Sequence, residues 1–199
     1  MSAAAVELPH DGRLPSLLEV AEELTEKLPG YRIEILGGNL TVTPRADGPH
    51  ADSLTDLTFA FAAAHGAESR VTQAMGVWLP DGPEDYAIPD LAVVDADYRD
   101  HLIANNCYDP AVFRMVLEVT SSNYATDLKT KVTAYAIAKV PVYVIVDRRK
   151  DRIHVLTDPF ANEYRSHSVH ARGQHVTLPG SIGADITLDV EAILESARP

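Results

Sequence analysis

The chain has 199 residues, with 17 lysines and arginines against 29 aspartates and glutamates, and a formal net charge of −12. A chain of this length most often forms one domain, so we expect a single domain over residues 1–199. The hydrophobic fraction of 46% and the charged fraction of 23% are typical of a globular protein and exclude a disordered chain.

Membrane and secretory classes are also excluded by the sequence. No apolar run approaches the roughly 20 residues that span a bilayer. The N-terminal segment MSAAAVELPH has no basic stretch followed by an apolar core, so it does not resemble a signal peptide. Cys107 is the sole cysteine, which excludes an intrachain disulfide and a zinc site made of cysteines. We therefore expect a protein of the cytoplasm.

The charge is distributed unevenly along the chain. Residues 1–100 carry 6 basic and 18 acidic residues, whereas residues 101–199 carry 11 of each. The acidic balance argues against a nucleic-acid partner. The later half nevertheless contains a basic run at residues 148–152, which is compatible with a local basic face. A solvated, charged hairpin explains this run equally well.

The N-terminal third predicts a helix followed by a β-hairpin. Apolar residues recur at helical spacing from Pro15 to Leu28, and Pro29-Gly30 ends the pattern. Two alternating runs, 31–36 and 40–43, flank the turn Gly37-Gly38-Asn39 and predict a hairpin.

Two further elements are predicted before the middle of the chain. A second helix is expected from about Pro49 to His65, with apolar residues on one face. A strand is expected from Val71 to Leu79, ended by the sequence Pro80-Asp81-Gly82-Pro83.

The middle of the chain predicts a parallel strand–helix–strand unit. The nearly all-apolar runs Ile88–Val94 and Phe113–Val119 predict buried strands, and a polar loop from Thr120 to Thr126 leads to a helix over about Asp127–Lys139. The apolar run Val140–Val146 then predicts a strand parallel to the previous one.

The C-terminal elements are shorter. We expect strands at Arg152–Thr157, near Tyr164–Val169 and near His175–Leu178, and a last helix at about Val190–Ala197. The fold class is therefore α/β, a mixed β-sheet flanked by helices, with an N-terminal helix and β-hairpin.

Two acids interrupt the apolar strands of the middle region. Asp90 and Glu118 are costly to keep charged there without compensation. Two carboxylates that converge from neighbouring strands would repel each other and favour a hard cation such as Mg²⁺. Each acid taken alone is equally compatible with a strand end at which it pairs with an arginine.

Three other residues are weaker candidates. Lys131, on the helix after Glu118, is placed either to reach back over the carboxylates or to pair with Asp127 on the helix surface. Glu34 is a third carboxylate, although the alternation of its strand favours the solvent face. His50 begins a helix, which favours a cap or a surface position over a metal ligand.

These residues stand in an order that resembles a known family. The matching segments are Tyr31–Leu40, Ile88–Val94, Leu117–Ser121, Asp127–Ala136 and Val140–Asp147. Together they resemble the Uma-two family, restriction endonucleases of bacteria in the PD-(D/E)XK superfamily. The resemblance covers roughly Tyr31 to Thr157, and it implies a restriction-endonuclease-like fold.

The resemblance also implies roles for individual residues. Asp90 is similar to the acid of the "PD" element and Glu118 to that of the "(D/E)XK" element, while Glu34 matches an upstream glutamate of the metal site. Lys131 matches the family's lysine on the following helix. The chain departs from the superfamily pattern at two places. Thr120 stands where the superfamily usually has a lysine, and Ser121-Ser122 stands where it usually has a serine-proline step.

The function expected from the sequence is that of a Mg²⁺- or Mn²⁺-dependent DNA endonuclease. Asp90, Glu118, Glu34 and the backbone carbonyl of Val119 are the expected metal ligands, and Lys131 is expected to orient the attacking water or support the phosphate. By the same resemblance we expect a homodimer. One alternative is an inactive nuclease fold that acts in binding or assembly, and another is an RNA or nucleotide phosphodiesterase.

Overall fold

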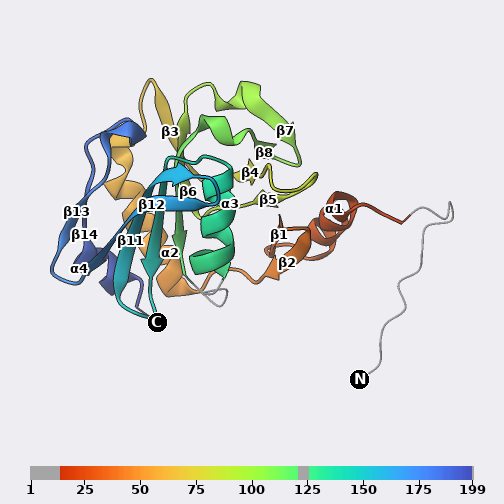
Figure 1. The fold of residues 1–199 in the computed structure, drawn as a ribbon. Helices are drawn as coiled ribbons and strands as arrows, with labels where there is room; N and C mark the ends of the chain where they lie inside the picture. The colour runs from red at the N-terminus through yellow and green to blue at the C-terminus, as the bar shows by residue number, and fades with distance from the viewer. Residues whose placement is uncertain (1–13, 121–125, 199) are drawn as a thin grey trace.

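The computed structural model describes residues 14–120 and 126–198. Within these residues the chain forms two six-stranded sheets, a small two-stranded sheet and four α-helices (Figure 1). The second six-stranded sheet contains both parallel and antiparallel pairs. The predicted α/β class, a mixed sheet flanked by helices, is confirmed.

The described elements have the following bounds. The α-helices are α1 (Leu17–Lys27), α2 (Gly48–Ala60), α3 (Lys131–Ile137) and α4 (Val190–Ser196). The first sheet, in the order β2-β1-β5-β4-β8-β7, contains β1 (Arg32–Leu36), β2 (Asn39–Thr43), β4 (Gly76–Trp78), β5 (Tyr86–Ala87), β7 (Leu102–Ala104) and β8 (Cys107–Tyr108). The second sheet, in the order β12-β11-β10-β9-β6-β3, contains β3 (Ser69–Gln73), β6 (Leu91–Asp95), β9 (Phe113–Val119), β10 (Val142–Asp147), β11 (Arg152–Phe160) and β12 (Glu163–Ala171). The small sheet pairs β13 (His175–Thr177) with β14 (Thr187–Asp189).

The predicted strand–helix–strand unit is β9-α3-β10. The two strands pair in parallel, with Val116 opposite Tyr143. A single π-helical turn, Thr126–Thr130, precedes α3. Most of the predicted loop before it, including Ser121-Ser122, lies outside the described residues.

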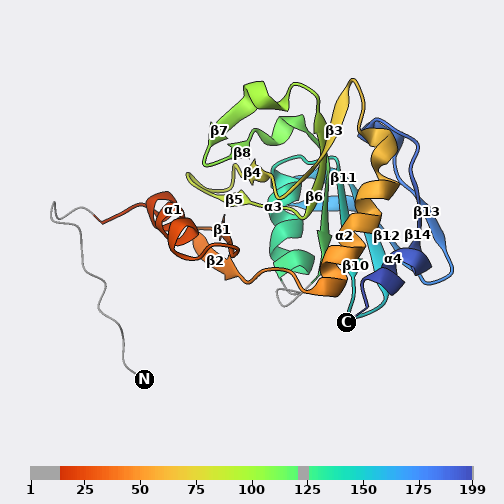
Figure 2. The ribbon, with the colours of Figure 1, turned by 180° about the vertical axis from the view of Figure 1, so that it is seen from behind.

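The second sheet is covered on both faces. In Figures 1 and 2, α3 lies against one face, and α2 and α4 lie against the other. Strand residues alternate between two hydrophobic cores, so that Val93 packs on the α2 and α4 side and its neighbour Val94 packs on the α3 side. Because both faces are buried at the centre of the sheet, the central strands β6, β9 and β10 are apolar almost throughout.

The N-terminal helix and hairpin pack on each other. Ser16 caps α1 through a reciprocal pair of hydrogen bonds with Glu19, so the preceding Pro15 lies just outside the helix. The hairpin turn uses Gly37 and Gly38, with φ of +57° and +69°. Such values are typical of the two-residue turns that join twisted strands.

The sequence interpretation was wrong about one strand. The run Val71–Leu79 is split between β3 and β4, which lie in different sheets, because the backbone turns at Ala74 with φ of +51°. The strands β7, β8 and β14 were not expected, since each has two or three residues and is too short to show an alternating pattern.

Cys107, the single cysteine, is buried, and burial raises the pKa of its thiol to about 12. Among the described helices, none combines the length and the apolar character required to cross a membrane.

The hairpin turn gives a test of the fold. Gly38→Ala is expected to lower the free energy of unfolding by about 1–2 kcal/mol, because an L-residue with φ near +69° is strained. Urea denaturation measures this change. Gly48→Ala is the matched control, since Gly48 begins α2 and has open space around it; this change is expected to be neutral or slightly stabilising. Equal losses in both variants would contradict the assigned turn geometry.

Candidate functional site

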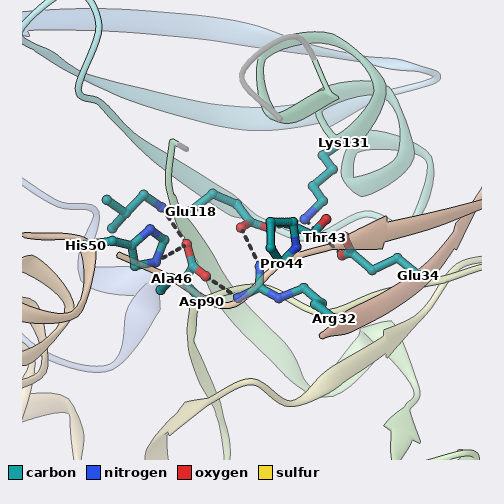
Figure 3. Close-up of a pocket in the computed structure, with 10 residues that line it drawn as sticks. Arg32, Glu34, Thr43, Pro44, Ala46, His50, Asp90, Glu118 and Lys131 are labelled. Atoms are coloured by element: carbon teal, nitrogen blue, oxygen red, sulfur yellow. Dashed lines mark hydrogen bonds and ion pairs between the residues drawn. The ribbon is translucent and has the colours of Figure 1, made fainter. Parts of the chain in front are cut away.

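A polar pocket lies where the first sheet meets the second. Its empty volume is about 360 Å³. The residues that line it are Arg32, Glu34, Thr43, Pro44, Ala46, His50, Asp90, Glu118, Val119 and Lys131 (Figure 3). Every expected site residue therefore borders one pocket, although they come from four separate parts of the chain.

Strand pairing brings Asp90 and Glu118 together. Leu91 pairs with Leu117 in the antiparallel register of β6 and β9. Asp90, which precedes Leu91, therefore lies beside Glu118, which follows Leu117. Side chains alternate along a strand, and both acids therefore point to the α3 face of the second sheet. Both are buried.

Asp90 is held by three groups. Its Oδ2 accepts a hydrogen bond from the Val119 amide at 2.8 Å and lies 3.3 Å from His50 Nε2. Its Oδ1 forms an ion pair with Arg32 Nη2. Burial alone would raise the pKa of Asp90, but the hydrogen bond from His50 and the charge of Arg32 hold it well below its usual range.

Glu118 is held mainly from α3. Its Oε1 lies 2.6 Å from Lys131 Nζ and accepts a hydrogen bond of 3.2 Å from the Tyr135 hydroxyl. Lys131 and Tyr135 are four residues apart and so share one face of the helix. Burial is the largest cause that raises the pKa of Tyr135 well above its ordinary value, and the nearby charge of Glu118 is the second. The hydroxyl therefore stays protonated and donates its hydrogen bond.

Lys131 bridges the two sheets. Its Nζ lies 2.9 Å from Glu34 Oε1, as well as contacting Glu118, and its side chain is 2% exposed. The alternative position on the helix surface is therefore wrong. Figure 3 shows Lys131 reaching from its helix toward both carboxylates.

Glu34 is buried, so the expectation that its strand alternation favours the solvent face is wrong. The reason is that β1 is covered on both faces: Ile33 and Ile35 pack on α1, while Glu34 faces the second sheet. Glu34 Oε1 also accepts a hydrogen bond of 2.7 Å from the Ile88 amide. Sequence alternation could not show that a second sheet covers this face.

His50 was expected as a cap or a surface residue, and both assignments are wrong. Asp47 is the cap of α2, and it accepts a hydrogen bond of 2.8 Å from the His50 amide. The cap places His50 in the first turn, with its ring buried against Asp90. The other ring nitrogen, Nδ1, is buried and has no hydrogen-bond partner among the residues that the structure describes.

Arg32 lines the pocket and was not among the candidates from the sequence. Besides its ion pair with Asp90, its Nη1 lies 3.5 Å from Glu118 Oε2. Burial would lower the pKa of Arg32, but the charges of Asp90, Glu118 and Glu34 outweigh burial and raise it. The available signal was its position two residues before Glu34, which places both side chains on one face of β1.

Thr120, which stands where the superfamily usually has a lysine, makes two hydrogen bonds that hold neighbouring backbone. Its buried hydroxyl donates to the Val146 carbonyl at 3.2 Å and accepts from the Arg148 amide at 3.0 Å. Arg148 in turn contacts Asp47, the cap of α2. A lysine ammonium is instead brought to Glu118 from α3 by Lys131.

The donor chemistry of the site suits a hard cation, although its present geometry does not form a ligand set. Three carboxylates and one imidazole border the pocket, and Mg²⁺ and Mn²⁺ prefer oxygen ligands. Among the described residues, no three His, Cys, Asp or Glu side chains are arranged as metal ligands. Carboxylate oxygens of the site contact Arg32 and Lys131 instead.

Comparisons with known proteins agree with the fold. The model of a family described as "Uma2: Putative restriction endonuclease" matches residues 20–191. Among solved structures, the chain is similar to "a putative nuclease belonging to DUF820 from Anabaena variabilis ATCC 29413", with 14% identity, a TM-score of 0.69, and coverage of 88% of this chain and 97% of that chain. At that identity the likeness concerns the fold. No curated protein matches the chain.

The buried ammonium of Lys131 gives the first test of the site. Lys131→Met in a metal-free buffer is expected to lower the free energy of unfolding by about 3–5 kcal/mol, because it leaves two buried carboxylates without their shared cation. Urea denaturation measures the loss. Lys129→Met is the matched control on the same segment, and its exposed side chain predicts a change within about 0.5 kcal/mol.

The low pKa of Asp90 gives a second test. Its folded pKa is below the unfolded value of about 3.9, so its contribution to stability is full above that value and is lost as the pH falls toward the folded pKa. Between about pH 5 and pH 3, the wild type is expected to lose stability more steeply than Asp90→Asn. Asp56→Asn, on the exposed face of α2, should keep the wild-type slope. Identical slopes in all three proteins would contradict the assigned ion pair.

Proposed function

Because the chain belongs to the Uma2 family of restriction endonucleases, we propose that it hydrolyses phosphodiester bonds in DNA with the help of Mg²⁺ or Mn²⁺. The observation that carries the proposal is the buried meeting of Asp90, Glu118 and Glu34 with Lys131 at one pocket. Buried carboxylates of this kind are costly to a fold, so their convergence on one pocket favours a functional site.

In this proposal the carboxylates of Asp90 and Glu118 hold the cation, and Glu34 and the Val119 carbonyl complete its surroundings. His50 is a further candidate ligand, since its ring contacts Asp90 and its buried Nδ1 has no hydrogen-bond partner within residues 14–120 and 126–198. A divalent ion in such a site activates water and stabilises the charge on a phosphate.

The cationic residues have separate roles. Lys131 is buried between two carboxylates, where it orients the attacking water or supports a phosphate oxygen. Arg32 is partly exposed at the pocket, so its guanidinium is placed to move from Asp90 to an incoming phosphate. Tyr135 positions Glu118 through its hydroxyl hydrogen bond.

The assembly and location implied by the resemblance belong to the same proposal. A homodimer would bring two sites to one nucleic acid. A location in the cytoplasm would bring the protein to cellular DNA.

A second candidate function is that of a non-catalytic binding protein with a nuclease fold. It is favoured by one observation: Asp90 and Glu118 are already paired with cations of the chain itself. In that case the network would only stabilise the fold, and added Mg²⁺ or Mn²⁺ would have no effect. An RNA or nucleotide phosphodiesterase would keep the metal response and cleave a different substrate.

Metal binding separates these functions. Millimolar Mn²⁺ is expected to raise the melting temperature of the wild type, since a ligand at about a hundred times its Kd adds about 2.7 kcal/mol of stability. Asp90→Asn and Glu118→Gln should lose this rise, and both should lose cleavage of plasmid DNA by at least about a hundredfold. Asp56→Asn is the control and should retain both properties. Full cleavage by Asp90→Asn would refute the proposed site.

Arg32 gives an independent test, because its guanidinium competes with a cation for Asp90. Arg32→Met is expected to tighten Mn²⁺ binding about tenfold, the equivalent of one charge-assisted hydrogen bond. The same change should reduce cleavage. Arg114→Met removes a comparable ion pair, with Asp95 at the far end of β6, and should leave Mn²⁺ binding unchanged. Calorimetric titration of both variants measures the difference.

A further inference from the structure

A second groove adjoins the site. Its lining residues are Gly30, Tyr31, Arg32, Pro44, Arg45, Ala46, Ala74 and Ile88. Arg32, Pro44 and Ala46 line the site pocket as well, so the two hollows lie side by side. The volume of the groove is about 330 Å³, near the lower end of the range of small-ligand pockets of about 300–1,000 Å³.

The charge of the groove is opposite to that of the chain. Its lining contains two arginines and no carboxylate, although residues 1–100, which supply all of the lining, contain 18 acidic residues. Arg45 is exposed, and no ion pair joins it to another residue in the described part of the chain. A solvated arginine beside a nuclease site suits an anion of the substrate.

Tyr31 supplies an aromatic surface in the same groove. Its side chain is 45% exposed, immediately before β1 and next to Arg32. An exposed aromatic ring next to arginines is the usual combination for stacking an unpaired base while neighbouring cations contact the phosphates. A base within a duplex is already stacked on both faces, so it offers no free face to Tyr31.

We propose that this groove binds an unpaired nucleotide of the substrate strand next to the scissile phosphate, with its base on Tyr31 and its phosphate at Arg45. The proposal rests on the proposed nuclease function and names its substrate class, a single-stranded or locally unpaired nucleic acid. Arg32 links the two hollows, so a strand that crosses from one to the other places consecutive phosphates near Arg32 and Arg45.

The test is binding of a short fluorescein-labelled single-stranded DNA, followed by fluorescence anisotropy with Ca²⁺ in place of Mn²⁺. Tyr31→Ala is expected to weaken binding about tenfold to a hundredfold, while Tyr31→Phe keeps the ring and binds as the wild type does. Arg45→Ala is expected to reduce the salt dependence, the slope of log K against log salt, by about 0.7. The same oligonucleotide annealed to its complement should bind more weakly.

Two controls come from elsewhere on the surface. Phe59→Ala removes an exposed ring on α2, and Arg152→Ala removes an exposed cation at the start of β11, next to the charged turn 148–151. Both should bind single-stranded DNA as the wild type does. If Arg152→Ala weakens binding more than Arg45→Ala, the strand follows the charged turn and the groove proposal is wrong. Tighter binding of the duplex, or unchanged binding by Tyr31→Ala and Arg45→Ala, also overturns it.

The groove and the nuclease site can fail separately. Tyr31→Ala should keep the wild-type rise in melting temperature with Mn²⁺, because Tyr31 does not line the site pocket. A metal response without Tyr31-dependent binding would overturn the groove and leave the nuclease proposal intact. Tyr31-dependent binding without any metal response or cleavage would support the groove as a nucleic-acid site and overturn the nuclease function.

Discussion

The structure depends on a buried network in which two cations hold three carboxylates together. Lys131 joins Glu34 of the first sheet to Glu118 of the second, and Arg32 joins the hairpin to Asp90. An isolated charge at such depth would cost several kcal/mol, so each of these side chains is tolerated only with its partners in place. The network therefore fixes how the two sheets meet. A hydrophobic contact would perform that task at lower cost, which indicates that the charges are kept for another purpose.

The surrounding elements all contribute to the position of this network. The tight glycine turn sets the register of the hairpin, which puts Arg32 and Glu34 on one face. The parallel β9-α3-β10 unit returns α3 over its own strand, which brings Lys131 to Glu118. The cap of α2 is tied to the turn after β10 by Arg148, and this contact fixes the start of the helix that carries His50.

Local pattern was sufficient for part of this arrangement. Asp90 and Glu118 were identifiable because carboxylates interrupt strands that are otherwise apolar. Lys131 and Glu34 were weaker candidates, and the family resemblance gave them roles. Strand alternation places Arg32 on the face of Glu34, but the pairing of Arg32 and His50 with Asp90 joins residues 58 and 40 apart in sequence, which no periodicity encodes. The split of the run Val71–Leu79 was missed for a related reason. A single residue with positive φ, Ala74, sends the two halves to different sheets, and alanine carries no signal for that conformation.

The charges of the site also indicate how an ion and a phosphate would enter it. Setting His50 aside, the carboxylates of Glu34, Asp90 and Glu118 exceed the cations Arg32 and Lys131 by one negative charge. A divalent ion alone would turn this excess into one positive charge, whereas an ion together with a phosphodiester group would leave the site neutral. Burial penalises net charge of either sign, so the two should bind more tightly together than separately. We therefore expect bound nucleic acid to tighten Mn²⁺ binding beyond the affinity that the protein has alone. The arginines of the adjoining groove allow this acidic protein to bind a nucleic-acid strand. The strand needs positive charge only along the path that it follows on the surface.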